Sequence, residues 1–250
     1  MKSYYNAPPS GSEVDVALGL VPGRAAFGKF GFNPAIGTTE EDVWDIGGDH
    51  PEDVSAETWN IRSASTDDVD TTGTGAQTVE VYGLDGSYNL ANETIEMNGT
   101  SNVATSTSYT FIHRIVVETA GSGGTAAGNI QATAPTPGTV GAQITQGYDQ
   151  SLMAIYMVPV DHSLVIDGLY WGSVRNGAAL DVTPRLVVKR FGGVWNTKRL
   201  VGGRTTGAAP MYMPVRNIVV PAKALVKVSA VCSAAGTEVF AGFDGTLVQV

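Results

Sequence analysis

Three aspartates, Asp67, Asp68 and Asp70, lie close together in the segment STDDVDTTGTG and could hold a cation. Ca²⁺ prefers several oxygen ligands, which carboxylates supply, but the spacing matches neither an EF-hand loop nor the nonapeptide calcium repeat. The alternative is an acidic turn whose side chains bond their own backbone. We predict no metal and no cofactor, and leave open whether Ca²⁺ binds near Asp67 to Asp70.

Other residues capable of chemistry are too scattered to form a recognisable catalytic site. His50, His113 and His162 are far apart in the sequence, and none belongs to a metal-binding Cys/His cluster. The glycine-rich run 121–125 lacks the Gly-Lys-Ser/Thr of a phosphate loop, and there is no nucleophile elbow G-x-S-x-G. The single Cys232 follows an apolar run, which favours a buried small hydrophobe. The sequence therefore predicts a protein that is not an enzyme.

Aromatic residues in the second half of the chain could line a sugar-binding face, because aromatic rings stack on the apolar faces of sugars. Tyr170 and Trp171 are adjacent, so in a strand they point to opposite faces and at most one of them faces the core. Core packing is the alternative for most of these rings. Under the sugar-binding hypothesis, Trp171 and Trp195 are the glycan-facing residues.

The segment Thr71 to Thr100 has the residue pattern of antiparallel β-structure. Val79 and Val81 alternate with polar residues, which is the period of a half-buried strand. Asp85-Gly86 and Asn98-Gly99 supply residues typical of tight turns. The pattern predicts a β-hairpin in this segment.

Composition extends this prediction to the whole chain. Of the 250 residues only 16% are charged, while 31 are Gly and 12 are Pro. Mid-helix Gly costs about 1 kcal/mol and Pro about 3 kcal/mol, so many short strands are favoured over helices. Short strands recur from Thr58 to the end of the sequence, which predicts an antiparallel β-sandwich over residues 58–250. A subdivision near residue 148 into two β-domains is the alternative.

Residues 1–57 differ from the rest of the chain. They mix aromatic residues with Pro and Gly and show no clean strand period. Because this segment is too aromatic to remain a disordered tail, we expect an extended N-terminal arm that lies either on a neighbouring subunit or on its own sandwich.

Charge is distributed unevenly along the sequence. Residues 1–120 carry 18 acidic and 5 basic side chains, whereas residues 121–250 carry 6 and 10, so net charges of −13 and +4 make up the total of −9. A solvated acidic face explains this, and so does the contact of acidic and basic faces between neighbouring subunits. The acidic half is a poor partner for nucleic acid.

Neither targeting nor membrane insertion is indicated. The first 13 residues contain no apolar core of a signal peptide, and no stretch of about 18 apolar residues occurs. We expect a protein made in a cytoplasm that is not inserted in a membrane.

Several segments together resemble virion structural proteins of tailed bacteriophages. They are residues 73–88 (GTGAQTVEVYGLDGSY), 93–100 (ETIEMNGT), 31–34 (GFNP), 41–48 (EDVWDIGG) and 155–159 (IYMVP). The likeness covers approximately residues 30–175 and consists of strand and turn patterns.

The resemblance implies a jelly-roll-like β-sandwich displayed on a phage particle, as a capsid decoration or cement protein, a head-fibre base or a tail component. Such proteins commonly act as homotrimers, so the expected partners are the major capsid protein and other copies of this chain, and the expected location is the virion. We assign Phe27, Phe30, Phe32 and Trp44 as arm anchors on the capsid, and Arg185, Lys189 and Arg190 as complementary charge. The alternative is a tail or head-fibre module that binds host carbohydrate.

Overall fold

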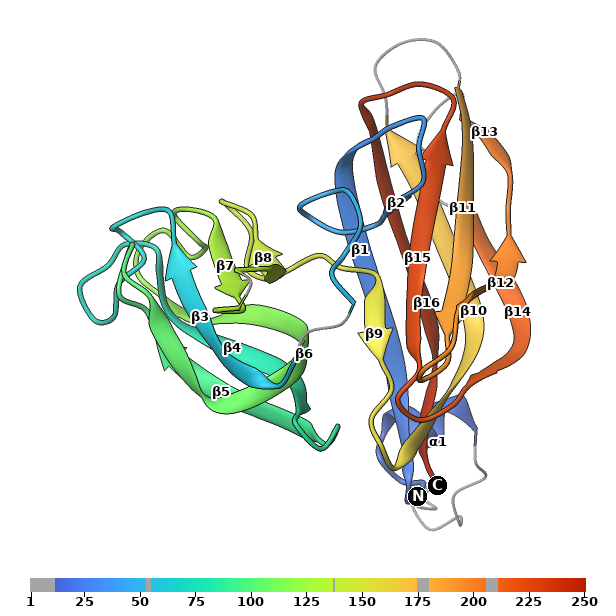
Figure 1. Ribbon diagram of the computed structural model, residues 1–250, viewed down its shortest axis with the longest axis horizontal. Helices are drawn as coiled ribbons and strands as arrows, with labels where there is room; N and C mark the ends of the chain where they lie inside the picture. Colours follow the sequence, from blue (N-terminus) through green and yellow to red (C-terminus); the bar gives the residue numbers. More distant parts are fainter. Residues whose placement is uncertain (1–11, 53–54, 137, 175–179, 206–210) are drawn as a thin grey trace, which may run out of the picture.

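The computed structural model describes residues 12–52, 55–136, 138–174, 180–205 and 211–250 of the 250-residue chain. Two β units lie side by side in Figure 1, and one short helix is present among the described residues. All strand pairs are antiparallel, which confirms the predicted all-β, antiparallel fold class.

The larger unit is a sandwich of two sheets. Its first sheet has the order β1 (Arg24–Ile36), β16 (Thr237–Gln249), β10 (His162–Val174) and β14 (Met211–Val220). Its second sheet has the order β12 (Trp195–Leu200), β11 (Leu180–Lys189), β15 (Leu225–Cys232) and β2 (Glu41–Asp42). Two short strands extend the second sheet: β13 (Gly203–Thr205) on β11 and β9 (Ile155–Met157) on β15.

Strand β15 shows why these residues form a sandwich. Seven of its eight residues are buried, because it lies between β11 on one side and β2 and β9 on the other. Val226, Val228 and Ala230 point into the core between the two sheets, where they join Phe243 of β16. The buried thiol of Cys232 lies in the same core, as the sequence predicts.

The smaller unit, which we call the inserted unit, is a single curved sheet of six strands. Its order is β5 (Leu90–Glu96), β4 (Ala76–Asp85), β6 (Val103–Ala120), β3 (Glu57–Ser63), β7 (Ile130–Thr133) and β8 (Val140–Ile144). The predicted hairpin is the β4–β5 pair, with Thr78 opposite Glu96 and Leu84 opposite Leu90. Gly99 has the positive φ of its predicted turn, but in the β4–β5 turn the left-handed residue is Tyr88 rather than Gly86.

The arrangement of the two units differs from the predicted arm over 1–57 and single sandwich over 58–250. Residues 24–36 form β1, which pairs with β16 along its whole length and is therefore an integral strand of the sandwich. The inserted unit interrupts this sandwich between β2 and β9, and the chain returns to the sandwich beyond residue 148. Residues 1–11 of the predicted arm lie outside the described residues.

The inward positions of β1 explain why the sequence does not reveal it as a strand. Every second residue from 29 to 33 is buried, and these are Lys29, Gly31 and Asn33. The buried face therefore carries no row of apolar side chains. A Cβ at Gly31 would lie 2.3 Å from both the Ala154 nitrogen and the Val43 oxygen. Glycine is required there because the neighbouring backbone approaches so closely.

The core of the inserted unit continues into the sandwich. Trp59, Ile61 and Ile115 of the inserted unit belong to one buried cluster with Met157 of β9 and Leu225 of β15. The two units therefore share apolar packing, which is the main stabilising term in such contacts.

The helix α1 (Glu13–Ala17) begins at Ser12, whose hydroxyl accepts a hydrogen bond from the Asp15 amide. It lies near the end of the sandwich where the amide of Gln249 donates to the carbonyl of Gly23. No helix among the described residues is long and apolar enough to cross a membrane.

Candidate functional site

A row of aromatic rings crosses the junction between the inserted unit and the sandwich. Successive ring centroids are 4.2 to 5.9 Å apart, within the range of favourable aromatic contacts. In order, the row consists of Trp44, His50, Phe111, His113, Tyr156, Phe27 and Phe243. The row therefore runs from the core of the inserted unit into the core of the sandwich.

His113 is the centre of this row and also connects the two units by hydrogen bonds. Its Nε2 lies 2.8 Å from the carbonyl oxygen of Met157, and its own carbonyl accepts a hydrogen bond from the ammonium of Lys29 on β1. Burial, together with the charges of Lys29 and Arg114, lowers the pKa of His113 to about 3. The imidazole is thus neutral at physiological pH and donates from Nε2.

Lys29 and Asp45 are further ionisable groups buried at the junction. Burial lowers the pKa of Lys29 to about 7, with a further contribution from the charge of Arg114. Burial also raises the pKa of Asp45 to about 8, although the amide of Leu152 donates to its Oδ2 at 2.8 Å. These shifts show that ionisable groups at the junction are largely removed from solvent.

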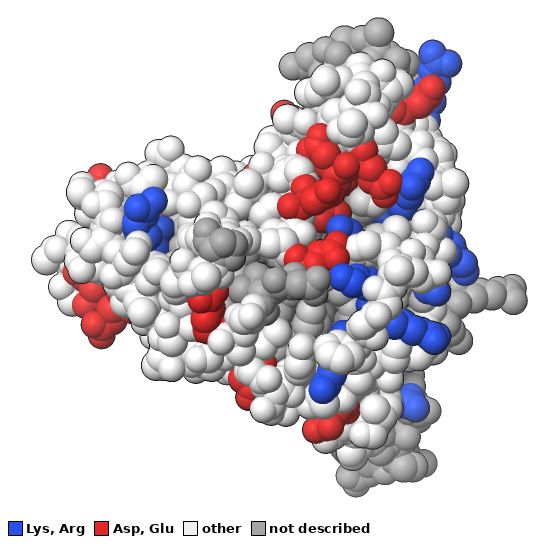
Figure 2. All heavy atoms as spheres, in the orientation of Figure 1, with Lys and Arg blue, Asp and Glu red and all other residues white. Residues whose placement is uncertain are grey.

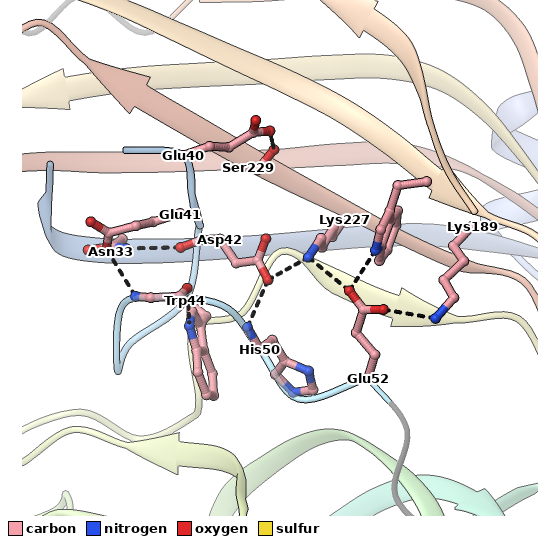
Figure 3. A network of polar contacts seen from close by, with 12 residues as sticks. Asn33, Glu40, Glu41, Asp42, Trp44, His50, Glu52, Lys189, Lys227 and Ser229 are labelled. Atoms are coloured by element: carbon pink, nitrogen blue, oxygen red, sulfur yellow. Dashed lines mark hydrogen bonds and ion pairs between the residues drawn. The ribbon is translucent and has the colours of Figure 1, made fainter. Parts of the chain in front are cut away.

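A second polar cluster centres on Lys227 of β15, as Figure 3 shows. Its Nζ lies 2.8 Å from Asp42 Oδ2 and 3.4 Å from Glu52 Oε1, and 4.4 Å from the centre of the Trp195 ring. Glu52 also accepts hydrogen bonds from Lys189 Nζ at 3.0 Å and from Trp195 Nε1 at 2.6 Å. The cluster joins the segment after β2 to β11, β12 and β15.

The two carboxylates of this cluster respond differently to their surroundings. Burial raises the pKa of Asp42 to about 6, against the opposing effects of Lys227 and of the His50 amide. Burial also acts to raise the pKa of Glu52, but hydrogen bonds and charges from Lys189, Lys227 and Trp195 outweigh it and leave this pKa below its usual value. Glu52 is therefore ionised at neutral pH.

Next to Glu52, a cleft of about 500 Å³ opens between the two units. Tyr88 and Thr110 line it from the inserted unit, while the sandwich contributes the turn between β11 and β12 and the turn before β15. The charged and aromatic side chains on the sandwich wall are Lys189, Arg190, Phe191 and Lys223. A cleft of this size at a domain junction is typical of small-molecule sites.

Lys223 and Tyr88 form the centre of the cleft wall. The Lys223 ammonium lies 4.7 Å from the centre of the Tyr88 ring and 5.6 Å from that of Phe191, and these two rings contact each other at 85°. Both Tyr88 and Lys223 have positive φ, at 67° and 59°. Left-handed backbone at such residues is uncommon, and it is concentrated at functional sites.

The structure places the predicted capsid anchors mostly inside the molecule. Trp44 is 3% exposed and its Nε1 donates to the carbonyls of Gly47 and Gly48, so its assignment as a capsid contact is wrong. Phe27 packs against the sandwich core, and Phe32 is half-buried on β1. Phe30 is 40% exposed and is the one of the four that remains at the surface.

The three predicted basic contacts lie on or next to β11, but two of them are engaged within the chain. Arg185 pairs with Glu40 at 2.8 Å and Lys189 pairs with Glu52 at 3.0 Å. Arg190 is exposed. Their assignment to a capsid interface stays a prediction, with Arg190 the most accessible of the three.

The two predicted glycan-facing residues are both engaged in packing. Trp171 is 2% exposed in the sandwich core, so its assignment to a sugar-binding face is wrong. Trp195 is half-buried between Lys227 and Glu52. Neither ring is available as an open stacking platform.

Asp68 has a structural role in the acidic segment 67–70. This residue is fully buried and its carboxylate accepts hydrogen bonds from the Ser63 hydroxyl and from three amides, those of Ala76, Ala127 and Gly128, at 2.5 to 2.9 Å. Its oxygens thus connect Ser63 with the backbone at residues 76 and 127–128, which lie outside its own turn, so this carboxylate differs from the acidic-turn alternative. No group of three or more metal-binding side chains occurs among the described residues.

Sequence reasoning missed the residues that join the two units. His50, His113 and Lys227 showed no motif, because their partners are mostly backbone carbonyls and residues more than 40 positions away. A lysine flanked by valines in an otherwise buried strand was the only available signal, since a charge there requires a partner.

Surface charge separates into regions. In Figure 2 basic side chains gather over the part of the sandwich that holds β11 and β12, and acidic side chains gather beside them over the region of β2. Residues 180–200 carry five basic and one acidic side chain, whereas residues 57–144 of the inserted unit carry two and nine. The inserted unit is therefore acidic, while the β11–β12 part of the sandwich is basic.

No known protein family matches the chain, and no curated protein matches it. Similar solved structures include one of the Gx strain of infectious bursal disease virus, with 12% identity and a TM-score of 0.27 over 90% of this chain and 72% of that chain. Another is the VP2 subviral particle of that virus, with 11% identity and a TM-score of 0.26 over 92% and 72%. A likeness at these TM-scores carries no argument about function.

Proposed function

We propose that this chain is a non-enzymatic structural protein of a virus particle, which binds the assembled capsid shell as a decoration or cement protein. The observation that carries the proposal is the pairing of an acidic inserted unit with a basic β11–β12 hairpin on one rigidly joined molecule. Such opposed surfaces favour ordered contact between copies and with a lattice. The phage-like sequence patterns described above support the same class.

The exposed apolar residues of the basic hairpin support this role. Phe191, Val194 and Leu200 are 61% to 76% exposed around β12, which forms an edge of its sheet. Exposed apolar side chains bordered by charge are typical of interaction sites, and an open sheet edge requires a partner or protection. We assign this hairpin, with Arg190, as the surface that contacts the capsid or a neighbouring copy.

The mechanism is multivalent binding. A protein that contacts several capsid subunits at once binds the assembled shell more tightly than a single subunit, and this difference in affinity stabilises the shell. In a homotrimer, the acidic inserted unit of one copy meets the basic hairpin of the next, and three such contacts close into a ring.

Cryo-electron microscopy of the particle that carries this chain tests the role directly. Density repeated over the icosahedral shell is the expected result. Density confined to the tail or to a fibre would overturn the decoration role and favour the host-adhesion alternative.

Co-sedimentation with shells that lack this protein tests the surface. The double variant Arg190→Glu/Lys198→Glu should lose binding at least tenfold, because it removes the net positive charge of the hairpin. Arg24→Glu, an exposed charge reversal at the start of β1 on the other sheet of the sandwich, is the control and should bind shells like the parent. Equal binding by the parent and the double variant would remove the hairpin from the interface.

A further inference from the structure

We infer that the cleft between the two units binds a sugar ring that carries a carboxylate. The cleft shares Arg190 and Phe191 with the hairpin proposed to contact the capsid, but sugar binding is measured on the isolated protein, so the two proposals are tested separately. The volume of the cleft, the charge of its walls, its two aromatic rings and its hydrogen-bond acceptors all fit such a ligand.

The size of the cleft fits a small ligand. Its volume of about 500 Å³ lies within the usual range for small-molecule pockets. It is lined from both units, so a ligand there would contact the inserted unit and the sandwich at once. The shared core beneath it holds the two walls in place before a ligand arrives, which reduces the entropic cost of binding.

The charges of the walls select for a single negative group. Lys189 is already paired with Glu52, which leaves the positive charges of Arg190 and Lys223. Among the described residues, no carboxylate lies within ion-pair distance of either of these two side chains. One carboxylate can therefore bind next to Lys223 and Arg190, while a multiply charged phosphate would also meet the ionised Glu52.

The aromatic rings favour a sugar over a flat heterocycle. Phe191 is 65% exposed, so much of its side chain is accessible to the C–H groups of a sugar ring. Tyr88 stands at 85° to it, so the two rings form a corner and not a parallel slot. A planar base would stack on only one of them.

Acceptors for the hydroxyl groups of a sugar are present in the same cleft. Glu52 presents an ionised carboxylate, and the Thr110 oxygen, whose own proton bonds the carbonyl of Asp85, retains lone pairs. A ligand that combines one carboxylate, several hydroxyl donors and an apolar ring face satisfies all of these groups. Uronic and sialic acids have this chemistry.

The backbone conformation of Tyr88 and Lys223 is consistent with a preformed binding site. The carbonyl of Tyr88 accepts a hydrogen bond from the Val160 amide at 2.9 Å, and the amide of Lys223 donates to the Val158 carbonyl at 2.8 Å. Two left-handed residues are thus held in place by one segment of the sandwich. Such strained backbone is retained where the surrounding structure fixes it, as at ligand-binding sites.

The first experiment is an NMR titration of the full chain with glucuronic acid, and in parallel with glucose. We expect saturable shifts of cleft amides with glucuronic acid at millimolar concentration or below, and binding at least tenfold weaker for glucose. N-acetylneuraminic acid and its methyl ester form a second matched pair, and test whether the larger acidic sugar also fits. Equal affinity for acid and neutral sugar, or no saturable shift with either acid, would overturn the inference.

Two variants locate the site. Lys223→Asn removes the ammonium while keeping a residue type that tolerates positive φ, and Phe191→Leu removes an exposed ring, so both should fold. Each should weaken acid-sugar binding about tenfold or more. Lys198→Asn, on β12 outside the cleft, is the matched loss of charge and should bind like the parent.

Retained affinity in Lys223→Asn would show that the sugar binds elsewhere and would overturn the assignment. Tighter binding of ATP than of either acid sugar would overturn the ligand class in favour of an anionic nucleotide. Thermal unfolding of each variant, measured alongside, separates loss of the cleft from loss of the fold.

Discussion

The imidazole of His113 lies almost parallel to the phenol ring of Tyr156, at an interplanar angle of 21° and a centroid distance of 4.2 Å. His113 belongs to β6 of the inserted unit and Tyr156 to β9 of the sandwich, so this stack joins the two units. A neutral imidazole suits the contact, because both its ring face and its Nε2–H are used. The stability of the junction should therefore depend on pH.

The first prediction concerns acid. The pKa of His113 is about 3 in the folded protein and about 6.5 in an unfolded chain. Between these values the unfolded state binds more protons, so the contribution of His113 to the free energy of unfolding decreases as pH falls from about 6.5 toward 3. His113→Gln, which keeps a donor for the Met157 carbonyl, should show a smaller loss of stability between pH 7 and pH 5 in urea unfolding.

The variant must be compared with its parent, because Asp45 changes the free energy of unfolding with pH in the opposite direction to His113. Its pKa is raised to about 8, so its contribution to stability falls as pH rises from about 4 to 8. His162→Gln, on β10, is the matched His-to-Gln substitution outside the junction, and its stability is measured alongside. An identical pH dependence for His113→Gln and the parent would refute the role of His113.

A second prediction follows from the buried ion pair between Lys227 and Asp42. Lys227→Met leaves Asp42, which is 1% exposed, without its cation. Removing one partner of a buried pair costs about 3–5 kcal/mol. Asp42→Asn in the same background should recover part of this loss, so the two changes should be non-additive in urea unfolding. Additive effects within about 0.3 kcal/mol would show that the pair is not coupled.

The third prediction tests the place of β1 in the sandwich. Gly31→Ala would place a Cβ 2.3 Å from two backbone atoms, neither of which can rotate away. We expect a loss of stability of about 2–3 kcal/mol or more, in line with overpacking of a close contact. Gly202→Ala, whose Cβ would have nothing within 4 Å, is the control and should change stability by less than about 1 kcal/mol.

The fourth prediction concerns deletion of the N-terminal segment, which also tests the place of β1. Removal of residues 1–50 would take away β1 and β2 and expose one side of β16. The truncated chain should fail to fold, whereas a dispensable arm would leave a folded sandwich. Circular dichroism and solubility of the truncated chain distinguish the two outcomes.

Local patterns predicted the strands well, because hydrophobic alternation and turn residues act over a few positions. The β4–β5 hairpin and the turn at Gly99 follow directly from such patterns. Strand β1 escaped prediction because its buried face carries Lys29, Gly31 and Asn33, whose partners come from elsewhere in the chain. Burial of these residues is a tertiary property that alternation cannot show.

The same limit applies to the candidate site. Arg190 and Phe191 are recognisable as a basic and an aromatic residue, but Tyr88 and Lys223 lie more than 100 positions apart in the sequence and meet only because the inserted unit folds back onto the sandwich. Trp44 and Trp171 show the converse error, since the one was expected as an arm anchor and the other as a possible sugar-stacking ring, and both are core residues.

The last prediction concerns the acidic loop around Asp68. Its carboxylate accepts three backbone amides and one hydroxyl, so Asp68→Ala leaves buried donors without a partner. We expect a loss of about 3 kcal/mol or more, since hydrogen bonds to a charged acceptor are worth more than neutral ones. Asp67→Ala, an exposed neighbour in the same loop, should cost less than about 1 kcal/mol. Because the oxygens of Asp68 are already occupied by protein donors, calcium chloride should leave the melting temperature of the parent unchanged. A rise that saturates with calcium concentration would instead show that a cation binds the folded loop.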